Sequence, residues 1–228
     1  MASTYTDLGI ELMATGENAG TWGTKTNANL NLIEQLTGGF ATVSIAGGAG
    51  TTTLDIDDGA LTGTAQQRII EFTGSITGNR IVTIPNDVET FYILKNSTSG
   101  AYTVQFKYAT GSGSSTTFSA TDKGIKTIYA SANDGTNPDI VDVMANSSEI
   151  ALTNNNPIKF NDADNSAFVG IDAPATVSGS YTLTLPAGVG SASQALVTTD
   201  GAGTLGFTST STFGITTGKA IAMAIVFG

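Results

Sequence analysis

Histidine and cysteine are both absent from the 228-residue sequence. Histidine is the commonest general base and metal ligand, and the cysteine thiolate is a common nucleophile. Their absence excludes most familiar active sites, so we expect no enzymatic activity, no cofactor and no metal. A chain without disulfides fits a reducing compartment, or a protein whose durability comes from assembly.

Positive charge and long apolar segments are also scarce. Nine Lys and Arg stand against nineteen Asp and Glu, which gives a net charge of −10. Such a chain repels a phosphate backbone, so nucleic acid is not an expected partner. The longest apolar run, residues 220–227, is far shorter than the roughly 20 residues of a membrane-spanning helix. No leader of positive charge followed by apolar residues is visible, so we expect synthesis in a cytoplasm without membrane insertion.

Glycine and β-branched threonine are abundant, which favours short strands joined by turns. Alternating segments recur about every ten residues from Phe40 onward, and this spacing predicts a mainly β fold: a sandwich or small barrel closed by antiparallel pairing over residues 40–145. Tyr102, Val104, Phe106 and Tyr108 share one face of a strand and are expected in its core. The expected strands are residues 41–45, 68–72, 80–84, 91–95, 102–108, 126–130 and 140–144.

One short helix is predicted within residues 21–37. Thr26 or Asn27 can cap its start, an apolar stripe recurs at helical spacing, and Gly38 with Gly39 ends it. So short a helix is marginal in water, and its stripe needs a partner. Two interpretations stay open, namely packing onto the following sheet and self-association in a trimer. The stripe consists of Leu30, Ile33 and Leu36, and we expect the nearby Trp22 to anchor the helix.

A second, smaller module is predicted after a linker at residues 146–157. It spans residues 158–228, and its few short strands cannot bury much apolar area alone, so partner chains are expected to complete the core. Its apolar end is expected to be buried, as a core strand of the same oligomer or as a plug for another protein. The expected strands are residues 158–160, 167–171, 181–185, 195–198 and 204–207, and the oligomer core is assigned to Ile221, Met223, Ile225 and Phe227.

Two acidic segments superficially match cation sites. Residues 55–59 resemble the start of a calcium loop, but the glycine comes one position early and Gln66 stands where a closing glutamate is needed. Residues 161–165 are more simply an acidic turn. Neither segment predicts a bound metal.

Several segments resemble tail-fibre and related virion proteins of tailed bacteriophages, especially those of marine hosts. Residues 21–34 (TWGTKTNANLNLIE) are similar to the N-terminal opening of such proteins. The segments similar to the β module and to the short shaft repeat of these fibres are residues 72–85, 92–104, 173–176, 181–186 and 194–205.

The resemblance implies a homotrimer located in the virion. Residues 1–39 would dock on other virion proteins through Trp22, Leu30, Ile33 and Leu36, and the later modules would project outward. The chain shows no obvious distal receptor-binding or depolymerase domain, which favours a short tail fibre or a fibre-base adaptor. The alternatives are a capsid decoration or head fibre, and a tip that binds a host surface glycan.

Overall fold

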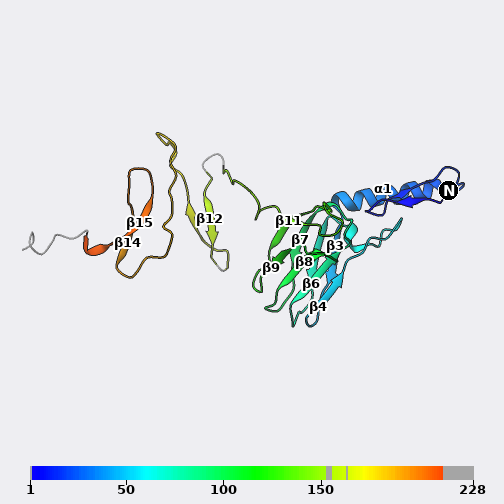
Figure 1. Cartoon of the computed structure of the whole chain (residues 1–228), viewed down its shortest axis with the longest axis horizontal. Helices are drawn as coiled ribbons and strands as arrows, with labels where there is room; N and C mark the ends of the chain where they lie inside the picture. The colour runs from blue at the N-terminus through cyan, green and yellow to red at the C-terminus, as the bar shows by residue number, and fades with distance from the viewer. Residues whose placement is uncertain (1, 153–155, 163, 213–228) are drawn as a thin grey trace, which may run out of the picture. The chain divides into compact units, whose positions relative to one another are not determined.

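The computed structural model describes residues 2–152, 156–162 and 164–212 and divides the chain into two units, residues 1–150 and 151–228. The protein is mainly β with one N-terminal α-helix, as predicted (Figure 1). The predicted oligomer-core residues Ile221, Met223, Ile225 and Phe227 lie outside the described residues.

The first unit begins with two short paired strands and the helix. β1 (Thr4–Tyr5) and β2 (Glu11–Leu12) are antiparallel, and α1 spans Trp22–Gly38. The helix starts several residues before the predicted caps Thr26 and Asn27, and the side chain of Thr21 at its N-cap accepts no capping hydrogen bond. Its end is as predicted, because Gly39 is extended and its N–H donates to the Gln35 carbonyl.

Nine strands form the two sheets of the first unit. The five-stranded sheet has the order β11-β10-β7-β5-β3, and the four-stranded sheet has the order β4-β6-β8-β9. The strands are β3 (Phe40–Ser44), β4 (Gly50–Thr53), β5 (Ile69–Thr73), β6 (Arg80–Ile84), β7 (Thr90–Asn96), β8 (Val104–Tyr108), β9 (Thr116–Phe118), β10 (Ile125–Ala130) and β11 (Ile140–Asp142).

From β3 to β8, successive strands alternate between the two sheets, so the chain follows a coil. Each turn of the coil adds one strand to each sheet, and we call such a pair of strands a layer. The three layers are β3 with β4, β5 with β6, and β7 with β8. The four pairs between layers are parallel, which corrects the prediction for these strands. The remaining pairs are antiparallel as predicted, since β10 pairs with β7 and β11, and β9 pairs with β8. The turns between the sheets stack too, since the Ile76 N–H donates to the Ser99 carbonyl. Gly100 permits this approach, because its φ is +100° and a Cβ there would lie 2.2 Å from the Ile76 oxygen.

Side chains from the inner faces of both sheets share one buried core. Phe72, Tyr92 and Phe106 meet at its centre, with ring centroids 6.3 Å apart for Phe72 and Phe106 and 5.8 Å apart for Tyr92 and Phe106. The predicted core residues Val104, Phe106 and Tyr108 are buried, but Tyr102 precedes β8 and is exposed. Burial raises the pKa of the Tyr108 phenol to about 12, and its hydroxyl donates to the Val88 carbonyl.

The two ends of this coil differ. At the last layer the short edge strands β9 and β11 are joined across the sheets, since the Ile140 N–H donates to the Ser114 carbonyl and the Ser114 Oγ donates to the Ile140 carbonyl. At the first layer β3 and β4 are the edge strands of their sheets, and neither contains a charged residue or proline. Such residues are the usual means by which proteins keep an edge strand from pairing with other chains.

The described part of the second unit contains two hairpins. β12 (Ile158–Asn161) pairs with β13 (Phe168–Ile171), and β14 (Gln194–Thr198) pairs with β15 (Leu205–Ser209). The predicted strand at residues 181–185 is reduced to an isolated bridge between Thr184 and Thr204. No α-helix among the residues that the structure describes is long and apolar enough to span a membrane.

The central role of Phe106 in the core predicts a large effect of its truncation. Phe106→Ala removes a fully buried ring between the sheets and should lower the free energy of unfolding by about 3–5 kcal/mol, measured by denaturant titration. Tyr102→Ala, two residues before the same strand, is the matched control and should change stability by about 0.5 kcal/mol or less. Equal losses in both variants would contradict the core described above.

Candidate functional site

One side of α1 is held against the N-terminal strands of its own chain. Glu11 on β2 is nearly buried, and its Oε2 lies 3.0 Å from the Nζ of Lys25 on the helix. Asn29, one turn further on, accepts from the Glu11 N–H and donates to the Glu11 carbonyl. The hydrogen bond from Lys25 holds the pKa of the Glu11 carboxyl below its ordinary value of 4.5. Leu32 continues this side and is fully buried.

The adjoining side of α1 carries apolar residues that nothing in the described chain covers. We call Thr26, Leu30, Ile33 and Thr37 the α1 stripe. Phe40 follows the helix as the first residue of β3. Leu30, Ile33 and Phe40 are 58%, 45% and 56% exposed. The sequence analysis left open that Leu30, Ile33 and Leu36 pack onto the following sheet; this interpretation is wrong for Leu30 and Ile33.

The four predicted docking residues are thus divided between two environments. Leu30 and Ile33 lie in the α1 stripe, and Trp22 is 65% exposed at the first position of the helix. Leu36 is half-buried, one turn beyond Leu32 on the side that the chain itself covers. The expectation that Trp22 anchors the helix is wrong, because a ring this exposed contributes little packing.

The hairpin of β12 and β13 has one wholly apolar face and one mixed face, on which Lys159 and Asn161 lie with Phe168. Ile158 opposes Ile171 and Phe160 opposes Val169, so these four side chains share a face, and they are 50–71% exposed. On the other face the Nζ of Lys159 lies 4.3 Å from the centroid of the Phe168 ring. An amphipathic hairpin with an uncovered apolar face is marginally stable at best in water.

The rest of the second unit has the same character. Leu196 opposes Phe207 on β14 and β15, and both are exposed. Tyr181, Leu183 and Leu185 alternate along the chain and are 54–74% exposed. Across residues 151–152, 156–162 and 164–212 no residue is buried. The described part of this unit therefore has no core of its own.

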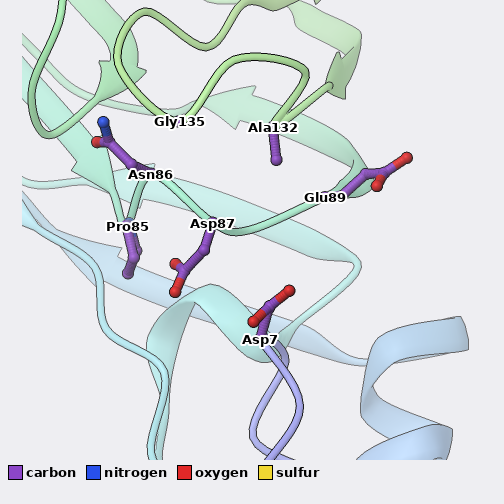
Figure 2. Close-up of a pocket in the computed structure, with 7 residues that line it drawn as sticks. All are labelled: Asp7, Pro85, Asn86, Asp87, Glu89, Ala132 and Gly135. Atoms are coloured by element: carbon purple, nitrogen blue, oxygen red, sulfur yellow. The ribbon is translucent and has the colours of Figure 1, made fainter.

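The first unit also contains an acidic hollow of about 560 Å³. Asp7 and Asp87 point into it, and Glu89 at its rim points away from them (Figure 2). The Glu89 carboxylate accepts a hydrogen bond from the Tyr129 hydroxyl. The hollow offers negative charge without a cation in its lining, which disfavours anionic ligands.

The two calcium-like segments make local hydrogen bonds. The Asp55 carboxylate accepts from the backbone N–H and the hydroxyl of Thr64, which lowers its pKa. In the second segment Asn161 donates to Asn165. No group of three or more acidic residues in the described ranges is placed to hold a metal ion.

Comparisons with protein-family models, with curated proteins and with solved structures gave no significant match. The chemistry of the exposed surfaces is therefore the basis on which a function can be proposed. Sequence reasoning marked Leu30, Ile33 and Trp22 but missed the hairpin face. The alternation of Ile158 with Phe160 and of Val169 with Ile171 was the signal for it.

The contact between Glu11 and Lys25 predicts a pH-dependent attachment of the N-terminal strands. Because the folded pKa of Glu11 is lowered, its stabilising contribution is present above the unfolded value of 4.5 and is lost as the pH falls through the folded value. Glu11→Gln should therefore speed amide hydrogen exchange in residues 2–14 at neutral pH. Corrected for intrinsic rates, the difference from the native chain should vanish well below pH 4.5.

The control for this variant is Glu34→Gln, which removes the same charge from an exposed helix position without a salt bridge among the described contacts. It should leave exchange in residues 2–14 unchanged. Faster exchange in both variants to the same degree would show that net charge, and not the Glu11 contact, holds the N-terminal strands.

Proposed function

We propose that this chain is a structural protein of a tailed-bacteriophage virion, a homotrimeric short tail fibre or fibre-base subunit. Its first unit attaches the protein to the particle, and its second unit builds a shaft together with other copies. The function is assembly and attachment rather than turnover of a substrate.

The observation that carries this proposal is the second unit, in which apolar faces have no cover within the described chain. Ordering the backbone of a residue costs roughly 1–2 kcal/mol, and full burial of a large apolar side chain contributes roughly 1.5–3 kcal/mol. A hairpin that leaves Phe160 and Val169 in water gains little of that contribution. The same faces, brought together from several copies, would form the missing core.

The similarity of residues 21–34 and of the later segments to phage fibres supports a virion role in particular. An antibody against the purified chain, labelled with gold, should mark the phage particles that carry its gene when they are imaged by electron microscopy. The chain should also co-purify with those particles through a density gradient. Particles that lack the chain while infected cells contain it would contradict the proposal.

The hairpin face predicts which substitution blocks self-assembly. Phe160→Asp puts a charge in the centre of the apolar face and should shift the native chain from a trimer toward a monomer, measured by light scattering after size-exclusion chromatography. The neighbouring Asn161→Asp introduces the same charge on the opposite face of the hairpin and should leave the mass unchanged. An unchanged mass in both variants would exclude this face from the assembly.

A further inference from the structure

The α1 stripe has the spacing of a coiled-coil seam. Within the helix, Thr26, Leu30, Ile33 and Thr37 follow one another at steps of four, three and four residues. This repeat keeps one line of side chains facing a partner helix with the same repeat. α1 is the only α-helix in the part of the chain that the structure describes, so no described element of the same chain can supply that partner.

The charge distribution favours another copy of the chain as the partner. The stripe has no charged residue, although the chain carries a net charge of −10 and its copies repel one another over most of their surface. Facing stripes bring no like charges together. The side of the helix that faces away from Glu11 is polar and exposed, with Asn27, Asn31 and Glu34, and it flanks the stripe.

The residue types in the seam also indicate the number of copies. With the seam positions of the heptad named a and d, the steps place Leu30 at a and Ile33 at d. Leucine at a with isoleucine at d favours parallel assemblies of three or four helices over two. This observation is independent of the second unit, where the uncovered hairpin faces call for additional copies.

We infer that the α1 stripe is a contact between copies of this chain, in which the helices of three copies lie parallel and in register. The inference rests on the proposed self-assembly and deepens it. It reassigns Leu30 and Ile33 from docking on the particle to contact between subunits, and it leaves Trp22 beside the seam. The contact continues from the helix into Phe40 on the uncharged edge strand β3.

Absence of cysteine makes this inference directly testable, since one introduced thiol can pair only with the same residue of another copy. In a parallel, in-register assembly the Leu30 positions face one another, and a disulfide needs Cα atoms roughly 4.4–6.8 Å apart. Leu30→Cys in the full chain should give disulfide-linked dimers on mild oxidation. The matched control is Asn31→Cys, the next residue, on the polar exposed side, and it should give several-fold less linked product.

Light scattering on each variant before oxidation separates the outcomes. An associated chain in which Leu30→Cys links several-fold more than Asn31→Cys supports the contact. If both variants are associated and form equal amounts of linked dimer, the α1 contact is wrong, whereas the proposed assembly is not contradicted. A chain that is monomeric at all concentrations overturns the proposed assembly together with the contact. Leu30 is 58% exposed, so far-UV circular dichroism of its variant should match the native chain.

Discussion

Both units depend on the removal of apolar side chains from water, but they differ in how much of this burial their own strands provide. The first unit packs Phe72, Tyr92 and Phe106 between two sheets that its own strands build. The second unit places Ile158, Phe160 and their partners on the face of a two-stranded hairpin, where no second layer of the described chain meets them. The hydrophobic effect is proportional to the area buried, so the described part of the second unit gains little of it within one chain.

Layer-by-layer coiling explains how the first unit can be stable on its own and still offer surfaces for assembly. Each layer bonds to the next through parallel ladders, and the last layer is joined across the sheets at Ser114 and Ile140. The first layer has no such closure, and its uncharged strand β3 follows directly from the helix that carries the α1 stripe. Leu30, Ile33 and Phe40 are exposed where the coil begins, which suits a contact at that end.

The local sequence pattern predicted many of the strands and the helix. The features that it missed depend on contacts between residues far apart in the sequence. The limits of the strands at Arg80–Ile84 and the helix end at Gly39 follow from alternation and from glycine chemistry. β4 was missed because the glycines before Thr51 indicate a break, whereas pairing with β6 makes Gly50–Thr53 a strand. Parallel pairing was missed because it depends on which turns stack, and the burial of Leu32 was missed because it depends on contacts outside the helix. Leu30 and Ile33 were marked as apolar residues that need a partner, and the structure leaves both exposed.

The central claim is that the second unit acquires its core from other copies. It is tested most directly by amide hydrogen exchange of residues 156–212 in the full chain at a series of protein concentrations, with the mass measured on the same samples. The account predicts that backbone amides of β12 and β13 are protected in the assembled protein and lose protection on dilution as the mass falls to that of one chain. Equal protection in a monomeric chain would contradict it.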